Sequence, residues 1–204
     1  GPNNPANSTY YKEIETFTYD AANNLVGIKD EGGHTVANIY DYNDKYIVAS
    51  VINTVALADK PAYTSFETTS MGGWLLNGTS GYQNTGVTGS KSFLLSGNNN
   101  LQALINNSKS YKLSFWSSTG VNVSNGASLV KSAPTINGFT FYEYSIPSGN
   151  ASITITGNAT IDELRLYPAN ARMRTVSYDP LIGKTAECDE NNRITYYEYD
   201  ELSR

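Results

Sequence analysis

Hydrophobic and polar residues alternate in short segments along this chain, and most segments end in a cluster of Asn, Gly or Asp. A period of two predicts β-strands, and the clusters between them predict hairpin turns. Towards the two ends of the chain, the alternating segments are residues 16–20, 25–29, 35–40, 46–52, 174–179, 184–188 and 193–200. These segments predict two sets of β-hairpins.

The middle of the chain, residues 62–168, carries a second series of short strands. No run of a dozen residues combines a 3.6-residue period with freedom from Gly, Pro and β-branched clusters, so we expect an all-β protein. This many short strands in one segment predicts a jelly-roll-like β-sandwich. The expected strands are residues 62–67, 91–95, 101–105, 110–118, 127–132, 138–146, 151–156 and 160–167.

The two hairpin regions share a spacing, which indicates an internal repeat interrupted by an insertion. A Tyr-Asp pair recurs after 21 residues in both: at Asp20 and Asp41, and again at Asp179 and Asp200. The predicted domains are residues 1–9 as a disordered tag or linker, 10–61 as repeat hairpins, 62–168 as the sandwich and 169–204 as a repeat hairpin. Because the ends of an inserted domain usually lie close together, the two flanks are expected to pair with each other.

The repeat motifs resemble the Rhs or YD-repeat family of large bacterial surface and toxin proteins. The residues that carry the resemblance are Tyr178-Asp179, 189–193, 197–200 and 202–204. The first copy is looser, since Tyr42-Asn43 stands where a second Tyr-Asp is expected. The resemblance implies hairpins that wind into a β-strand shell, a place outside the cell or on the bacterial surface, and contacts with the remaining repeats of a parent protein.

The insert is similar to the galactose-binding-like fold of carbohydrate-binding modules. The similarity rests on residues 65–67, Trp74, 111–116, 141–146 and 161–164. It implies a non-catalytic module that binds a neutral glycan. In such modules a Glu near the first strand and an Asp in the last strand commonly help hold a structural calcium ion, and Glu67 and Asp162 match these positions.

The residues suggest where a glycan would bind. In residues 111–118, alternation puts Tyr111, Leu113 and Phe115 on one face and leaves Trp116 on the opposite, polar face. An exposed Trp can stack on the apolar face of a sugar ring, with polar loop side chains at the rim. The predicted glycan site is Trp116, Tyr142, Tyr82, Gln83 and Asn84. The alternative is that Trp116 is packed, as large aromatic residues on sandwich strands often are.

The last predicted strand raises a question about charge. If alternation holds, Asp162 shares a face with Leu164 and Leu166, while Glu163 and Arg165 point the other way. A carboxylate on an apolar face is costly unless a partner neutralises it. Calcium is one candidate partner. Backbone amides of a neighbouring loop are the other.

Charge narrows the classes of partner. The net charge is −5 and Lys and Arg form no cluster, which argues against nucleic acid as a partner. Residues 60–168 carry six Lys or Arg and four Asp or Glu, so the insert is nearly neutral and a neutral ligand is favoured. No apolar run approaches the roughly 18 residues of a membrane span, so membrane insertion is not expected.

Catalysis is not expected. The single His, His34, lies in a Gly-rich turn, and Cys188 in a repeat strand is predicted to be a buried thiol rather than a nucleophile. Asp162 and Glu163 are adjacent and cannot easily form a glycosidase pair. Two alternatives to glycan binding remain: a structural insert that caps or decorates the repeat shell, and a protein-binding adhesin domain. A structural insert would bury Trp116 against the repeats.

Overall fold

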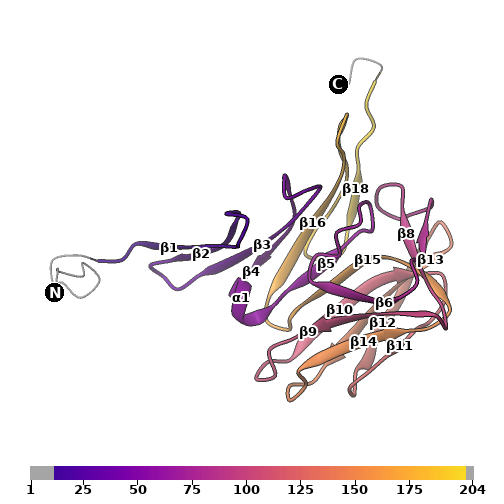
Figure 1. The fold of residues 1–204 in the computed structure, drawn as a ribbon, viewed down its shortest axis with the longest axis horizontal. Helices are drawn as coiled ribbons and strands as arrows, with labels where there is room; N and C mark the ends of the chain where they lie inside the picture. The colour runs from indigo at the N-terminus through magenta and orange to yellow at the C-terminus, as the bar shows by residue number, and fades with distance from the viewer. Residues whose placement is uncertain (1–11, 201–204) are drawn as a thin grey trace.

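A computed structural model of the protein describes residues 12–200, which form three antiparallel sheets (Figure 1). The all-β prediction is therefore confirmed. The predicted linker at residues 1–9 and the last motif residues, 202–204, lie outside the described part. The first sheet, here called the repeat sheet, has the order β1-β2-β3-β4-β16-β17-β18. Its strands are β1 (Glu15–Tyr19), β2 (Leu25–Asp30), β3 (Thr35–Asp41), β4 (Tyr46–Ile52), β16 (Arg172–Asp179), β17 (Gly183–Cys188) and β18 (Ile194–Tyr196).

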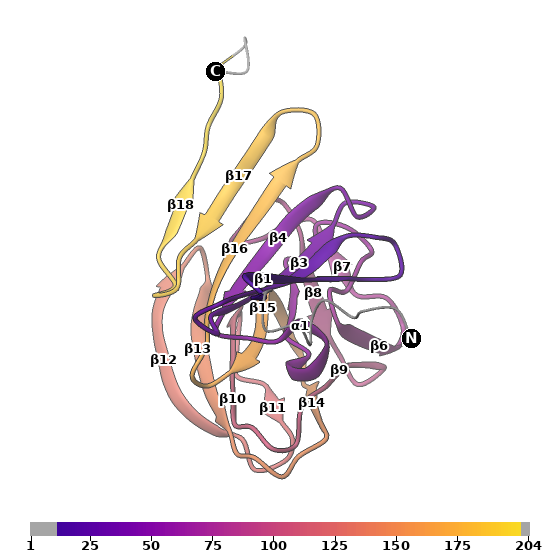
Figure 2. The same ribbon diagram turned by 90° about the vertical axis from the view of Figure 1, so that its left-hand side faces the viewer.

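The two flanks of the chain meet at the centre of the repeat sheet. Strand β4 pairs antiparallel with β16, with Ile52 opposite Arg172 and Ala49 opposite Thr175. Figure 2 shows these two strands side by side. The expectation that the flanks pair with each other is confirmed. Strands β1 and β18 form the two ends of the sheet in the described part of the chain.

The insert forms the other two sheets. One has the order β12-β13-β10-β15-β8-β7 with β5 paired to β15, and the other has the order β11-β14-β9-β6. The strands are β5 (Ala62–Thr64), β6 (Trp74–Gly78), β7 (Tyr82–Gln83), β8 (Ser92–Leu95), β9 (Asn99–Leu104), β10 (Tyr111–Ser117), β11 (Asn122–Val123), β12 (Ser128–Ile136), β13 (Phe139–Ile146), β14 (Ser152–Thr156) and β15 (Ala159–Pro168). Strands β6, β7 and β11 were missed by the alternation pattern because they are short or irregular.

These two sheets face each other across one apolar core. Tyr111, Leu113 and Phe115 of β10 enter this core, as alternation predicts, and they meet Leu101 of β9 and Ile153 of β14. All five side chains are fully buried. The larger sheet, which contains β10 and β15, therefore has an inner face towards this core and an outer face on its other side.

The repeat sheet packs on that outer face. Ala37, Val51 and Met173 of the repeats form a second apolar cluster with Tyr63 of β5 and Tyr167 of β15. The connector between β4 and β5 contains a single helical turn, α1 (Ala56–Asp59). Since both faces of the larger sheet are covered here, nearly all residues of β10 and β15 are buried whichever face they point to, and only Lys112 and Thr160 are partly exposed.

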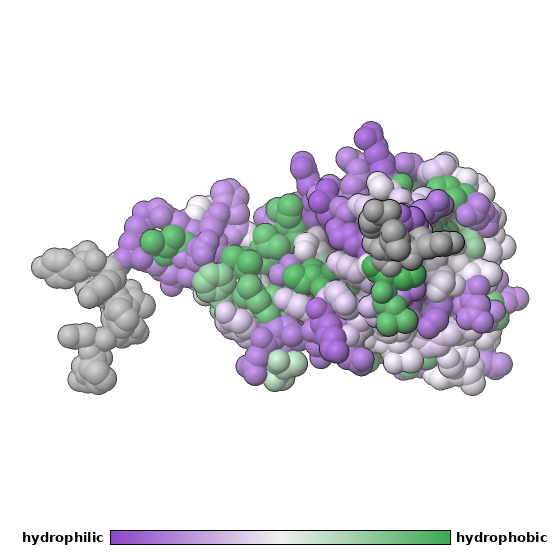
Figure 3. Space-filling view, turned by 90° about the horizontal axis from the view of Figure 1, so that it is seen from above, coloured by the Kyte–Doolittle hydropathy of each residue, from purple (hydrophilic) through white to green (hydrophobic). Residues whose placement is uncertain are grey.

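The opposite face of the repeat sheet is open. Phe17, Ile28, Val36 and Ile52 lie in register across β1 to β4, and Phe17 and Ile52 are about half exposed. Figure 3 shows apolar residues gathered on the repeat-sheet half of the molecule. Within the described residues, no helix is long and apolar enough to cross a membrane.

Candidate functional site

Trp116 does not lie on an exposed surface. It projects from the outer face of β10, as alternation predicts, but only 1% of the residue is exposed. It packs against Val87 and Phe141, with 5.6 Å between the ring centres of Trp116 and Phe141, and Ile194 of β18 packs on the same cluster. The prediction that Trp116 is available for stacking on a sugar is wrong, because the loop at Val87 and the repeat sheet cover this face.

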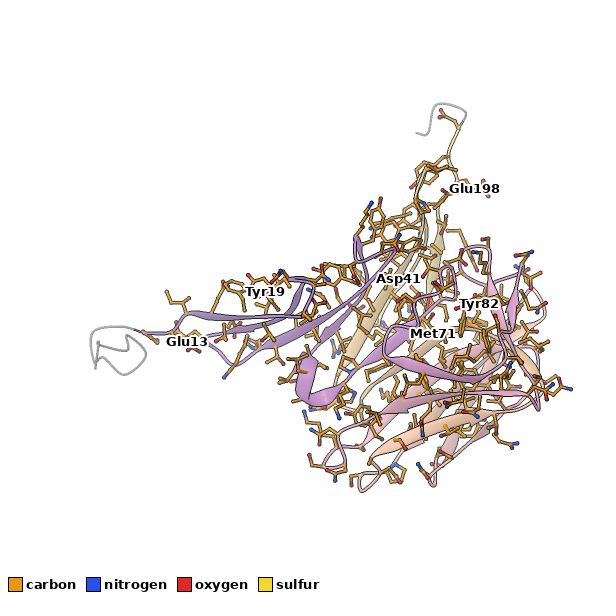
Figure 4. The ribbon with its side chains drawn as sticks, viewed as in Figure 1. Glu13, Tyr19, Asp41, Met71, Tyr82 and Glu198 are labelled. Carbon is orange, nitrogen blue, oxygen red and sulfur yellow. The ribbon has the colours of Figure 1, made fainter. Side chains whose placement is uncertain are left out.

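The other predicted glycan-site residues are not brought together. Tyr142 of β13 stacks on Phe115 at 5.8 Å. Tyr82 of β7 packs edge-on against Phe93. The hydroxyl of Tyr82 donates to Sδ of Met71 (Figure 4). Three strands, β10, β15 and β8, separate β13 from β7. At about 4.8 Å per strand, Tyr142 lies about 19 Å from Tyr82, too far for one compact sugar site.

Gln83 and Asn84 follow Tyr82 in the chain, and their side chains do not form a polar site together with the other predicted residues. The Gln83 side-chain amide donates to the carbonyl of Gly81, only two residues away, at 3.3 Å. Asn84 is exposed in the loop that follows β7. The five predicted residues therefore do not form one binding site.

A bulge in β15 changes the predicted face of Asp162. Glu163 has φ of +53°, and the pairing of β15 with β10 shifts register at this point. Asp162 pairs with Trp116 and so lies on the outer face, whereas Leu164 and Leu166 enter the core between the insert's two sheets. The prediction that Asp162 shares a face with these leucines is wrong, because a bulge inserts one residue and resets the alternation.

Asp162 is fully buried and accepts hydrogen bonds from three backbone amides. Its Oδ2 accepts from Val87 at 2.6 Å and Thr88 at 2.9 Å, and its Oδ1 accepts from Glu163 at 2.6 Å. Burial raises the pKa of this carboxyl well above its usual value, the neighbouring Glu163 raises it further, and the amide hydrogen bonds lower it. These contacts agree with the second candidate partner of Asp162, the backbone amides of a neighbouring loop.

Glu67 holds the other end of the same loop. Its Oε1 accepts from the backbone amides of Ser90 at 2.9 Å and Lys91 at 2.7 Å, and its Oε2 accepts from the Ser90 hydroxyl. The two carboxylates thus fix residues 87–91 through N–H and O–H donors. A cation needs oxygen ligands at these positions. Within residues 12–200, no group of three or more His, Cys, Asp or Glu side chains is placed to hold a metal ion, and a structural calcium ion at Glu67 and Asp162 stays a prediction.

A buried ionic network joins the insert to the repeats. Arg165 Nε donates to Oε2 of Glu163 at 3.2 Å, and the Tyr63 hydroxyl donates to Oε1 of Glu163 at 3.0 Å. From the repeats, the Thr175 hydroxyl lies 2.6 Å from Arg165 Nη2 and 3.1 Å from both oxygens of Glu163. Arg165 Nη1 also donates to the backbone carbonyl of Asp189 at 3.3 Å. Every charge in the network has a partner.

This network was not predicted, although one signal was present. Glu163 and Arg165 are, with Asp162, charged residues inside a strand that is mostly apolar. Burial alone would lower the pKa of Arg165, but Glu163, together with the nearby Cys188, Tyr63 and Tyr167, raises this pKa above its usual value. Cys188 lies next to this network and is fully buried, and burial raises the pKa of its thiol to about 12. Cys188 is therefore a buried thiol, as predicted.

The repeat aspartates cap turns of one kind. Oδ1 of Asp20 accepts from the amides of Ala22 and Asn24, and Oδ1 of Asp189 accepts from those of Asn191 and Arg193. Oδ1 of Asp30 accepts from the amide of His34, and Oδ2 of Asp30 lies 2.8 Å from Nδ1 of the same residue. The side chain of His34 is thus part of a hairpin turn. The expectation that the chain is not an enzyme stays a prediction.

Tyrosines link the first repeat to the second. The Tyr42 hydroxyl donates to the carbonyl of Tyr178 at 2.7 Å and accepts from the amide of Tyr178 at 2.9 Å. The rings of Tyr46 and Tyr178 stack at 4.8 Å, and Tyr42 meets both edge-on. Burial raises the pKa of Tyr42, so it remains a neutral hydrogen-bonding group across the physiological range.

Comparison of the chain with family models, with curated proteins and with solved structures finds no match.

Proposed function

We propose that this chain is part of a YD-repeat shell outside the bacterial cell, and that its jelly-roll-like insert has a structural role as a fixed cover of the repeat sheet. The observation that carries the proposal is the buried network of Glu163, Arg165 and Thr175, which spans the two parts. The hydrogen bonding of this network is complete only when the parts are docked, because the ion pair lies in the insert whereas Thr175 and the Asp189 carbonyl lie in the repeats.

The shared turn geometry supports the repeat assignment. In each of three turns, the residue three positions after the aspartate has positive φ: Asn23 at 65°, Gly33 at 81° and Asn192 at 64°. Asn and Gly are the residues that adopt this conformation at least cost. Similar sequence spacing thus goes with the same local structure in both copies.

The position of Trp116 supports a structural role for the insert. A glycan-binding Trp needs an open ring face, whereas Trp116 is buried in a cluster that includes Ile194 of the repeats. The apolar contact between Met173 of β16 and Tyr63 and Tyr167 of the insert points the same way. The jelly-roll-like description is supported by two antiparallel sheets that enclose one core.

Unfolding experiments test this proposal. Both tryptophans, Trp74 and Trp116, lie in the insert, so their fluorescence reports insert unfolding. Met173→Ala, made in the repeats, is expected to lower the stability seen by tryptophan fluorescence by about 2–5 kcal/mol, because a core side chain is lost. Leu181→Ala is the matched control, since Leu181 is 94% exposed. If the stability measured by tryptophan fluorescence were unchanged in Met173→Ala, the structural role of the insert would be refuted.

Binding of a neutral glycan is a second candidate function. It is favoured by the polar outer face of the insert's smaller sheet, which has the order β11-β14-β9-β6. Asn77, Asn100, Gln102 and Thr154 face away from the core there and are uncharged, and Asn77 donates to Asn100 at 3.0 Å. At the end of this face is a hollow of about 370 Å³ lined by Asn77, Gly78, Ser96, Gly97, Asn98, Asn99, Asn100, Thr156 and Gly157. Amides and hydroxyls of this kind can pair with sugar hydroxyls.

An affinity-gel screen against neutral polysaccharides tests this second candidate. Wild type is expected to be retarded and Asn100→Ala to be retarded less. Asn84→Ala is the control, because Asn84 is equally polar but lies in the loop after β7. Equal retardation of all three proteins, or none, would count against this face.

A further inference from the structure

A groove runs between the repeat sheet and the loops of the insert. It consists of two hollows of about 640 Å³ and 620 Å³, which share Tyr42, Thr68 and Pro180 in their linings and so adjoin each other. In Figure 4, Glu198 marks the end near the free tip of the repeats, and Asp41 lies closer to the insert. Two adjoining hollows of this size can hold an extended chain rather than a single small group.

Tyrosine rings line much of the groove. Tyr196 is 51% exposed and Tyr197 39% exposed, and both contribute to the larger hollow with Tyr178. Tyr46 contributes to the smaller one, and Tyr42 lies where the two meet. The face of a tyrosine ring is electron-rich and attracts a cation placed over it.

The charged side chains of the groove are mainly acidic. Five carboxylates line it, against the two ammonium groups of Lys45 and Lys91. The Lys91 ammonium donates to the backbone carbonyl of Glu67 at 2.9 Å. Among the carboxylates, Asp41 is buried and Glu67 accepts from the amides of Ser90 and Lys91, so Asp44, Asp179 and Glu198 are the ones most open to an occupant. The acidic residues are Asp41, Asp44, Glu67, Asp179 and Glu198. An acidic groove with aromatic walls favours a positively charged occupant and disfavours an anionic one.

The groove is preorganised. Both hydrogen bonds of the Tyr42 hydroxyl go to the backbone of Tyr178, which fixes the ring where the hollows meet. Glu67 fixes the backbone of Ser90 and Lys91 on the opposite wall. A rigid groove binds with a smaller loss of entropy than a mobile one.

We infer that this groove binds an extended, basic peptide segment, with Lys or Arg side chains over the tyrosine rings and beside the carboxylates. The peptide spans both hollows, and its backbone runs past Thr68, which belongs to both. This inference does not depend on the structural role of the insert, because Glu163, Arg165 and Thr175 of the buried network do not line the groove. The partner is a protein with an exposed basic segment.

Fluorescence anisotropy with labelled peptides tests the inference. The probe is a peptide of roughly eight residues that alternates Lys and Thr, long enough when extended to span the groove. Its controls replace Lys by Gln or by Glu. The Lys peptide is expected to bind, with an affinity that falls as salt is raised, while the Gln and Glu peptides bind at least tenfold more weakly.

Protein variants separate the groove from general attraction to an acidic protein. Tyr196→Ala and Glu198→Gln are each expected to weaken binding of the Lys peptide about 2- to 5-fold, which is the range for loss of an exposed cation–π contact at Tyr196 and of an exposed ion pair at Glu198. Their controls are Tyr19→Ala and Glu15→Gln, exposed residues of β1 outside the groove. Melting curves show that each variant is folded, which is expected because all four positions are exposed.

Three outcomes would overturn the inference. One is equal binding of the Lys and Gln peptides. Another is a loss with Glu15→Gln as large as that with Glu198→Gln, which would mean that only net charge matters. The third is binding of neutral oligosaccharides in preference to the Lys peptide, weakened by Tyr196→Ala, which would make the groove a sugar site.

Discussion

Arg165 and Glu163, two residues apart on β15, form an ion pair in which Nε and Oε2 lie 3.2 Å apart and both side chains are at most 2% exposed. They lie on the same side of the strand, as expected for residues two positions apart. Thr175 from the repeats completes the hydrogen bonding of both groups. The full set of hydrogen bonds around the pair therefore requires the docked repeat sheet.

Glu163→Gln is expected to lower the free energy of unfolding by about 3–5 kcal/mol, because it leaves the guanidinium of Arg165 buried without an opposite charge. Urea unfolding measures the loss. The double variant Glu163→Gln with Arg165→Met is expected to be more stable than Glu163→Gln alone, since it removes the stranded charge. A double variant that is less stable than the single one would contradict this account of the pair.

Trp116→Ala is expected to lower stability by about 3–5 kcal/mol, as for other fully buried large side chains. Trp116→Phe should cost much less, because Phe keeps an aromatic ring and the indole Nε1 has no hydrogen-bond partner in the described part of the chain. Chemical denaturation followed by circular dichroism gives both values. Leu75→Ala, at a side chain that is about half exposed, should change stability by less than about 0.5 kcal/mol. An equally small effect at Trp116 would place that residue at the surface.

Cys188 is expected to resist a thiol reagent such as DTNB at pH 8 in the folded protein and to react fully in denaturant. With the pKa raised to about 12 by burial, almost no thiolate is present at pH 8. The same shift means that folding keeps the thiol protonated, so its contribution to stability is complete below the unfolded pKa of about 8.5 and is lost as pH rises towards 12. Rapid labelling of the native protein would show that this part of the interface opens readily.

Removal of calcium is expected to leave the melting temperature unchanged, because Asp162 and Glu67 are satisfied by backbone amides. Thermal melts with EDTA and with added calcium make the comparison. A rise of several degrees with calcium that disappears in Asp162→Asn would establish the ion that the resemblance to carbohydrate-binding modules implies. The loop at residues 87–91 would then have to turn carbonyl oxygens towards the two carboxylates.

Local chemistry in the sequence determined most of the strands, the hairpin turns and the spacing shared by the two hairpin regions, but not strands β6, β7 and β11. Asp20, Asp30 and Asp189 cap turns through their own neighbouring amides, so nearby residues suffice to predict them. Alternation in residues 111–117 likewise placed Phe115 and Trp116 on opposite faces of β10, because successive side chains of a strand point to opposite sides.

Only the tertiary structure decided what covers each face and which residues meet. Trp116 is buried because a strand from the other end of the chain lies over it, and the bulge at Glu163 is held by contacts with Tyr63 and Thr175, which are distant in sequence. The groove at Tyr42 and Tyr196 exists because segments far apart in the sequence line it together, from both hairpin regions and from the insert. Burial, bulges and grooves depend on contacts between distant segments, and a pattern of neighbouring residues does not specify those contacts.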